Sequence, residues 1–265
     1  MKIFFSVLIF ILGISLGSFL SVVIPRLKYN KKGIIKGRSE CPKCKTRLSA
    51  SELIPLVSFL LLMGKCKNCK KPISWIYPTI ELVTGIIFLI FFWKWYPHDL
   101  VNGKELSMNL LWLALELVYA LVLIATFFYD LLYMEIPDKI LIPAILLALT
   151  ATVLPGSPHL IDALLGAMIP LAFFGLQIAV SGGRWMGGGD LRIGAFMGLI
   201  LGWKLVILAL MISYITGSII SVALIARKKG GLKTQIPFAP FLVTGTFLSM
   251  LEGEKILEWY FGLSL

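Results

Sequence analysis

Two aspartates stand where apolar segments of the chain meet polar ones. Asp130 follows two phenylalanines and a tyrosine, and Asp190 follows three glycines. An ionisable side chain at a membrane boundary is costly, so each acid is a candidate functional residue. Two carboxylates that meet can share one proton, so that the charged one activates a water molecule while the protonated one polarises a carbonyl. The pair therefore predicts peptide hydrolysis by an aspartyl mechanism, which needs no metal and no nucleophilic serine or cysteine.

Each acid also has a purely structural interpretation. Aspartate is a favoured N-cap, so Asp190 could simply begin a helix. Asp130 could instead pair with a basic residue such as Arg192. A third acid, Asp138, directly follows a proline at the start of an apolar segment, and we interpret it as a helix N-cap.

The glycines before Asp190 point to a substrate loop. Gly187, Gly188 and Gly189 give this approach little side-chain bulk and a permissive backbone, which suits close contact with an extended peptide, for example by strand addition. A phosphate-binding loop is the competing interpretation. It would need a Gly-Lys-Ser/Thr ending or a strand-to-helix setting, and the sequence has neither.

All four cysteines lie in two Cys-x-x-Cys pairs, Cys41 with Cys44 and Cys66 with Cys69. Two such pairs about twenty residues apart match a tetrahedral thiolate zinc site. Four thiolates leave no open position for water, so the predicted Zn²⁺ is structural and folds a small polar domain. A pair of disulfides or a redox couple is the alternative, which a cytoplasmic location would disfavour.

Membrane-spanning helices must position these residues. The chain has 265 residues, of which 58% are hydrophobic and 15% charged, with a mean hydropathy of +0.90. Apolar runs near the roughly 20 residues that cross a bilayer predict an all-α polytopic membrane protein. Glu81 and Glu116 fall inside such runs, where they either form buried structural contacts or line a polar cavity. Eight spanning helices are expected, near residues 3–25, 74–93, 109–129, 138–155, 160–180, 190–202, 204–226 and 237–251.

The charge pattern predicts the orientation. Residues 26–71 hold thirteen Lys or Arg and two acids, a balance of +11 that equals the net charge of the whole chain. The positive-inside rule places this loop in the cytoplasm, and eight helices then put both termini outside. Both aspartates fall at the cytoplasmic side on this topology. So do the basic residues Arg184, Arg227, Lys228, Lys229 and Lys233, while residues 95–107 and 155–159 fall outside.

Four regions follow from this pattern. They are a first spanning helix (1–25), a cytoplasmic zinc loop domain (26–73), a second spanning helix with an outer loop (74–108) and a six-helix aspartyl peptidase core (109–265).

Glycines also recur at the four-residue spacing that lets helices approach closely. Gly13 with Gly17 forms one such series, and Gly194, Gly198 and Gly202 form another. We therefore expect tight helix packing at both places, and no chemistry from these residues.

Taken in order, the motifs resemble the type IV prepilin peptidases, bacterial members of the GxGD membrane aspartyl proteases. The resemblance covers nearly the whole chain. Its elements are Gly17-Ser18-Phe19-Leu20, residues 22–27, Arg38 to Cys44, Glu52 to Leu56, Gly64-Lys65-Cys66, Tyr77 to Glu81, Asp130, Ile136-Pro137-Asp138 and Met186 to Asp190.

This resemblance implies a site, substrates and a second activity. Asp130 and Asp190 would be a catalytic pair facing the cytoplasm at the bacterial inner membrane. Its substrates would be prepilins or pseudopilins with a short basic leader, a glycine before the cleaved bond and a following apolar helix. Many members with the four-cysteine loop also N-methylate the new amino terminus with S-adenosylmethionine, and Gly64 and Lys65 match the part of that loop associated with methyl transfer.

Two other function classes compete with a peptidase. A transporter or channel could use the paired acids to carry protons or cations, but it would not explain the cysteine loop. A membrane-anchored nucleic-acid binder could use the basic loop, which however lacks interleaved aromatic residues for base stacking. We therefore expect pilin-type substrates and membrane lipid as partners, and no nucleic acid.

Overall fold

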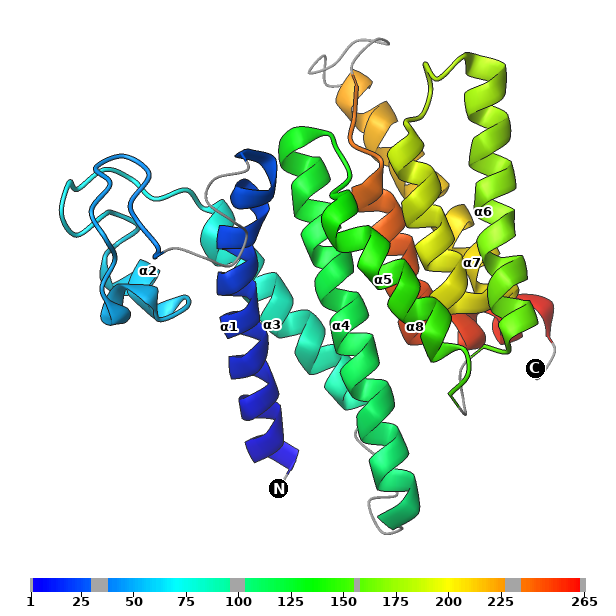
Figure 1. The fold of residues 1–265 in the computed structure, drawn as a ribbon, viewed down its shortest axis with the longest axis horizontal. Coiled ribbons are helices and arrows are strands. Elements are labelled where there is room, and N and C mark those ends of the chain that lie inside the picture. The colour runs from blue at the N-terminus through cyan, green and yellow to red at the C-terminus, as the bar shows by residue number, and fades with distance from the viewer. Residues whose placement is uncertain (1, 30–37, 96–102, 155–157, 227–234, 263–265) are drawn as a thin grey trace. The chain divides into compact units, whose positions relative to one another are not determined.

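The computed structural model describes residues 2–29, 38–95, 103–154, 158–226 and 235–262, with the side chains of residues 103–107 left out. Regular secondary structure in these ranges is helical, apart from two isolated bridges in the cysteine loop, so the all-α prediction is confirmed. The helices are α1 (Lys2–Tyr29), η1 (Ala50–Leu53), α2 (Val57–Leu61), α3 (Ile76–Trp95), α4 (Gly103–Tyr133), α5 (Asp138–Ala151), α6 (Leu160–Ser181), α7 (Gly188–Ala226) and α8 (Ala239–Phe261) (Figure 1).

The helices have the length and apolar character of membrane spans. Five in the described ranges meet both conditions: α1, α3, α6, α7 and residues 108–133 of α4. Large apolar side chains such as Leu165, Leu176 and Val180 of α6 are exposed, as expected for a surface that faces lipid. The multi-pass membrane class is therefore confirmed, and the count of eight spans stays a prediction.

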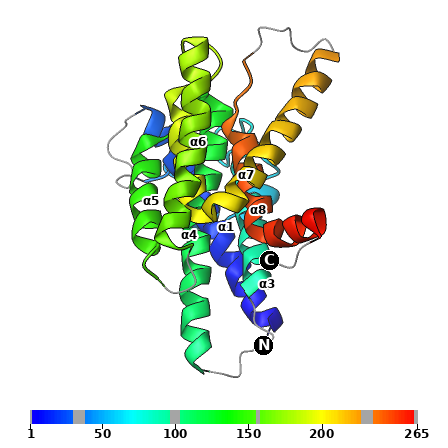
Figure 2. The same ribbon diagram turned by 90° about the vertical axis from the view of Figure 1, so that its right-hand side faces the viewer.

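Helix α7 contains the break that the sequence predicts between residues 202 and 204. Gly202 lies there with φ 72° and ψ 176°, a conformation that glycine adopts at little cost. The two parts of α7 run in different directions on either side of it (Figure 2). Helix α8, in contrast, continues past its predicted end at residue 251 to Phe261.

Several residues used to predict the orientation lie outside the described ranges. They are Arg227, Lys228, Lys229, Lys233 and the loop residues 96–102 and 155–157. The cytoplasmic placement of the cysteine loop therefore stays a prediction.

The chain divides into two compact units, residues 1–125 and 126–265. In the first, α1 packs against α3 through the predicted glycines. A Cβ added at Gly13 would lie 2.8 Å from the Cα of Gly85, and one added at Gly17 would lie 2.8 Å from the Cα of Glu81. The prediction of close packing is confirmed here, because no larger residue fits at this helix separation.

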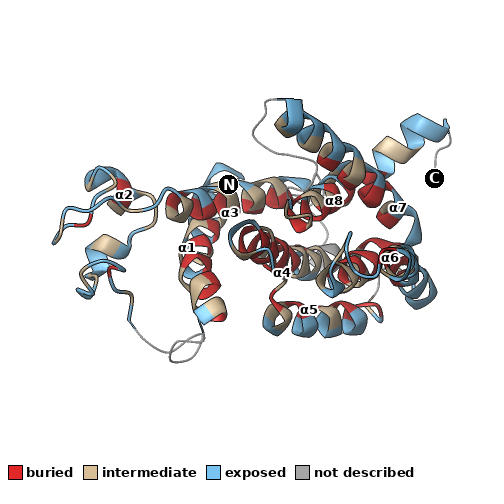
Figure 3. Cartoon of the chain, turned by 90° about the horizontal axis from the view of Figure 1, so that it is seen from above, coloured by how far each residue is buried: buried red, intermediate tan, exposed pale blue. Residues whose placement is uncertain are grey.

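In the second unit, α7 contacts α5, α6 and α8. A Cβ at Gly198 would lie 2.1 Å from the carbonyl oxygen of Gly166 on α6, and one at Gly245 of α8 would lie 2.3 Å from that of Ala209. Buried positions accordingly gather on the sides of α6 and α7 that face neighbouring helices (Figure 3). This packing fixes the start of α7, which carries Asp190.

Candidate active site and metal centre

Asp130 lies near the end of α4, with only 6% of the residue exposed. Its Oδ2 accepts a hydrogen bond from the backbone N–H of Ala239 at 3.0 Å. Ala239 is the first residue of α8, where N–H groups have no partner within the helix and the helix dipole attracts negative charge. The start of α8 therefore holds the carboxylate of Asp130 in a buried position.

Asp190 is the third residue of α7 and is half-buried. Its Oδ2 accepts a hydrogen bond from the N–H of Gly187 at 3.3 Å, and its own N–H donates to the carbonyl of Gly187 at 3.2 Å. The acid thus reaches back to the residue before the helix, as the third-position acid of a capping box does, rather than standing at the N-cap itself. The charge of Asp190 also acts on the carboxyl group of Asp130, so the two acids lie within electrostatic range of each other.

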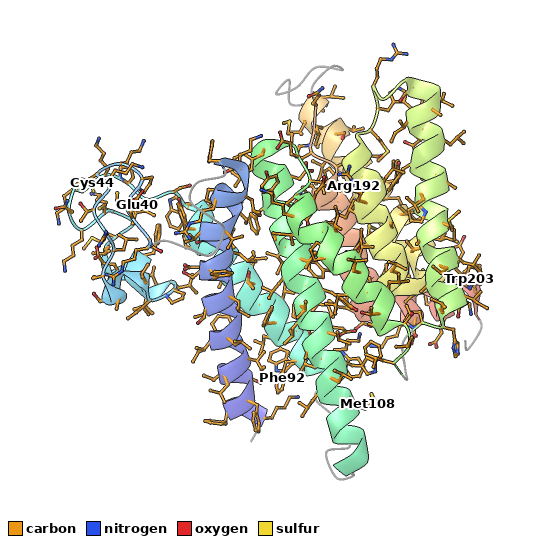
Figure 4. All side chains as sticks on the ribbon, viewed as in Figure 1. Glu40, Cys44, Phe92, Met108, Arg192 and Trp203 are labelled. Atoms are coloured by element: carbon orange, nitrogen blue, oxygen red, sulfur yellow. The ribbon has the colours of Figure 1, made fainter. Side chains whose placement is uncertain are left out.

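Two structural predictions are wrong: Asp138 is not the N-cap of α5, and Asp130 does not pair with Arg192. Pro137 occupies the N-cap position of α5, and Asp138 is the first helical residue. The carboxylate of Asp138 pairs with the guanidinium of Arg192, two residues beyond Asp190 on α7 (Figure 4 labels Arg192). Arg192 therefore pairs with Asp138 rather than with Asp130, and the pair ties the start of α5 to the first turns of α7.

The three glycines before Asp190 differ in their surroundings. A Cβ at Gly189 would lie 2.5 Å from Cγ1 of Ile136, so this glycine is needed for packing within the protein. A Cβ at Gly188 would meet nothing within 4 Å, and one at Gly187 only a backbone nitrogen at 4.0 Å. Space for an approaching backbone therefore exists at Gly187 and Gly188, but not at Gly189.

Tyr214 of α7 joins the two sides of this site, and sequence reasoning missed it. Its hydroxyl accepts a hydrogen bond from Nε2 of Gln177 at 2.9 Å and lies 3.8 Å from the sulfur of Met186, and the charge of Asp190 acts on it. Its ring packs edge-on against Phe238, the residue before α8, with centroids 5.1 Å apart. A lone tyrosine and a lone glutamine in apolar helices have no spacing signal, so only the fold reveals that they meet.

The four cysteines converge as predicted. Their sulfurs all lie within 4.8 Å of one another, and Cys41–Cys69 and Cys44–Cys66 are each 4.0 Å apart. Sulfurs at the corners of a tetrahedron with zinc bonds of about 2.3 Å would be about 3.8 Å apart. The donor set therefore fits one zinc-sized ion closely.

One backbone turn, used twice, aims the sulfurs. In the first turn the N–H of Cys41 donates to the carbonyl of Thr46 at 2.9 Å, and the N–H of Lys45 donates to Cys41 at 2.8 Å. The turn at 66–71 repeats both bonds at 2.9 Å. The fifth residue of each turn is left-handed, with φ 60° at Lys45 and 57° at Lys70. The repeated geometry places each Cys-x-x-Cys pair on the same side of its turn.

The cysteine thiols differ in pKa. Hydrogen bonds from Thr46 lower the pKa of Cys44 to about 6, and backbone bonds from Cys69 and Asn68 lower the pKa of Cys66. The pKa of Cys69 lies at about 11, because burial and the other sulfurs outweigh a backbone bond from Lys71 that lowers it. A metal ion that binds all four thiolates would displace the remaining protons.

Gly64 and Lys65 lie between α2 and the second turn. Gly64 has φ +68°, its carbonyl accepts the N–H of Ile73 at 2.7 Å, and a Cβ there would lie 3.1 Å from the ring of Phe59. Lys65 is exposed and forms an isolated bridge with Pro72. The backbone conformation alone therefore favours glycine at position 64.

A large cavity of about 1150 Å³ opens beside these turns, within the first unit. Its walls come from α1, the cysteine turns, the η1–α2 segment and the start of α3, and it includes Glu81. Glu81 is 8% exposed, and its Oε2 accepts the N–H of Leu56 at 2.8 Å. Glu81 therefore both forms a buried structural contact and lines a polar cavity, as the two interpretations had it. Glu116 forms a structural contact: its carboxylate accepts hydrogen bonds from Nζ of Lys94 at 2.7 Å and from the indole N–H of Trp95.

Comparison with known proteins agrees with these features. Residues 11–95 match the Bacterial Peptidase A24 N-terminal domain, and residues 117–222 match the Type IV leader peptidase family. The prepilin leader peptidase/N-methyltransferase of Bacillus subtilis (strain 168) is 32% identical, over 97% of this chain and 98% of the relative. Relatives of the same name from Aeromonas salmonicida (strain A449) and Pseudomonas aeruginosa are 31% and 29% identical, over 96% and 94% of this chain and 92% and 91% of their own. No solved structure matches. The chain belongs to the type IV leader peptidase family.

Proposed function

We propose that this protein is a membrane aspartyl endopeptidase that removes the basic leader of prepilins or pseudopilins at the cytoplasmic face of the membrane. The observation that carries the proposal is the shared site of Asp130 and Asp190, two acids on different helices whose charges interact and which backbone N–H groups hold in place. Family membership supports the same reaction. It gives no support to a transporter.

The proposed reaction needs one proton on the pair. The ionised carboxylate takes a proton from water, whose oxygen attacks the scissile carbonyl, while the protonated carboxyl donates to the carbonyl oxygen. The carbon–nitrogen bond of the tetrahedral intermediate then breaks, and the leaving nitrogen takes up a proton. The open space at Gly187 and Gly188 would admit the backbone beside the cleaved bond. Tyr214 would keep the loop before Asp190 against Phe238.

The test is cleavage of a prepilin in membranes by Asp130→Asn and Asp190→Asn variants. Each should lose at least about 10³-fold in rate, because an amide can neither take the proton nor share it. Asp162→Asn is the matched control. Asp162 lies in the first turn of α6 beside Gly202, which is twelve residues beyond Asp190 along α7. Wild-type cleavage by either active-site variant would refute the mechanism.

We further propose that Cys41, Cys44, Cys66 and Cys69 hold a structural Zn²⁺. The ion would join the two cysteine turns and supply folding free energy rather than chemistry, since four thiolates close its coordination sphere. One zinc per purified chain is expected, and Cys44→Ser should lose it. Zinc absent from the purified wild type would contradict this proposal.

The second proposed activity is N-methylation of the new amino terminus with S-adenosylmethionine, in residues 26–73, separate from a peptidase core at 109–265. The names of the relatives and the match of residues 11–95 to the A24 N-terminal domain support it. A cleaved pilin that gains the mass of one methyl group only when the donor is added would verify the activity.

A further inference from the structure

The short helix α2 turns large apolar side chains outward. Leu60 and Leu61 are 71% and 77% exposed, and Met63, two residues after α2, is 84% exposed. Trp75, the residue before α3, is 73% exposed. We call these four residues the α2 patch. Single exposed apolar residues are common, but a cluster of them marks a surface that has a partner.

The inner side of α2 is packed, so the exposure of the patch is built into the fold. The ring of Phe59 is buried and packs edge-on against Trp75, with centroids 4.9 Å apart. Gly64 lies close to the same ring, since a Cβ there would be 3.1 Å from it. Phe59 therefore joins α2 to the start of α3, while Leu60 and Leu61 stay outside this contact.

A hydrogen bond fixes the level of α2 along the spanning helix α3. Glu81 is the sixth residue of α3, so at 1.5 Å per residue it lies about 7.5 Å along the helix from its start. Its Oε2 accepts the N–H of Leu56, the residue before α2, at 2.8 Å. The start of α2 therefore lies beside the first two turns of α3, not beyond its end. Interfacial helices lie about 5–10 Å deep in the headgroup and acyl boundary, which is the same level.

The residues from α2 to α3 carry only positive charge. Residues 57–75 contain no acid and four exposed lysines, Lys65, Lys67, Lys70 and Lys71. Lysines near a membrane surface are attracted to anionic headgroups, and tryptophan is enriched where the membrane meets water. Exposed apolar side chains, a tryptophan and lysines are together typical of a segment that lies in the membrane interface. An acidic protein would match the lysines but not the apolar side chains beside α3.

We propose that the α2 patch inserts into the interface of the bilayer that α3 spans, and that the four lysines bind anionic lipid headgroups there. The cysteine loop then lies on the membrane surface instead of standing in solvent. This contact requires neither of the proposed reactions. It keeps the loop next to any substrate whose apolar helix stays in the bilayer.

Photo-crosslinking of the full-length protein in lipid nanodiscs tests this contact. Benzoylphenylalanine replaces Leu61 in one sample and, as the matched control, the exposed Lys43 of the first cysteine turn in another. The nanodiscs contain radiolabelled phosphatidylglycerol and phosphatidylcholine. Illumination should join lipid to position 61 with at least about ten times the yield at position 43, because only position 61 enters the bilayer.

Three outcomes would overturn the assignment of the patch to lipid. They are no lipid adduct at position 61, equal lipid yields at positions 61 and 43, and an adduct with residues 126–265 or with an added prepilin in place of lipid. Thermal unfolding like that of the wild type shows that a variant is folded. If the Leu61 variant does not fold, the same replacement at Met63 decides, since its side chain is still more exposed.

Lys67→Gln together with Lys71→Gln tests the headgroup contact. With benzoylphenylalanine at position 61, this change should lower the ratio of phosphatidylglycerol to phosphatidylcholine adducts at least about twofold, because charge attracts only the anionic lipid. An unchanged ratio would refute the role of the lysines.

Discussion

The contact between α6 and α7 gives the sharpest prediction. A Cβ at Gly198 would lie 2.1 Å from the oxygen and 2.2 Å from the carbon of the Gly166 carbonyl, which are backbone atoms of a packed helix. An ordinary contact for that methyl group begins at 3.4 Å, so Gly198→Ala must push the helices apart by roughly 1.3 Å. Overpacking of this kind costs about 1–3 kcal/mol.

The same displacement should reach the candidate active site. Gly198 lies eight residues after Asp190 on α7, so α7 cannot shift away from α6 without moving Asp190 relative to Asp130. A misplacement of about 1 Å can cost about 10²-fold in rate. We therefore expect Gly198→Ala to lower both the unfolding temperature in detergent and kcat/KM for prepilin cleavage.

Gly175→Ala is the matched control for this prediction. Gly175 lies on α6, and a Cβ there would meet nothing within 4 Å. Alanine should therefore stabilise the helix by about 0.5–1 kcal/mol and leave cleavage unchanged. Equal stability and equal cleavage by the Gly198→Ala and Gly175→Ala variants would refute the packing argument.

Three further predictions concern other parts of the chain. Tyr214→Phe removes the hydroxyl that bonds Gln177 and should lower kcat/KM for cleavage about tenfold, which steady-state kinetics would check; an unchanged value would mean that Tyr214 only packs. Zinc affinity should fall as the pH falls from 8 to 6, because the Cys69 thiol, with a pKa of about 11, is protonated without the metal and must lose its proton on binding, and a flat competition titration between these pH values would contradict this. Arg192→Ala breaks an ion pair whose side chains are 45% and 44% exposed, so it should cost less than about 1 kcal/mol in thermal unfolding, and a larger loss would show that the pair does more than tie two exposed helix ends.

The sequence was sufficient to predict the structure where the spacing of the residues along the chain defines their geometry. The glycines at four-residue spacing lie at helix contacts, and Gly202 breaks α7 at the expected place. The two Cys-x-x-Cys pairs meet at one point. In each case the spacing along the chain already contains the geometry, so a single sequence is enough to infer it.

Predictions from the sequence were wrong where a residue has several possible tertiary neighbours. Asp138 follows a proline and looks like an N-cap, yet its partner is Arg192, 54 residues away. No local pattern shows that α5 and α7 are neighbours. Gly189 looks like part of an open substrate loop, but Ile136 fills the space beside it. Such choices depend on tertiary contacts, which the sequence alone does not display.

The cysteine cluster also has a consequence for chain entropy. A metal bound at Cys44 and Cys66 would close a ring of about twenty residues that contains the η1–α2 segment. Closing a loop of this length restricts the unfolded chain by an amount worth about 3 kcal/mol. Residues of this ring also line the cavity, so the metal would stabilise the folded form that contains the cavity, and zinc occupancy and occupancy of the cavity would be thermodynamically linked. By reciprocity, a ligand in the cavity would tighten the hold on the metal by the same factor by which the metal tightens the hold on the ligand.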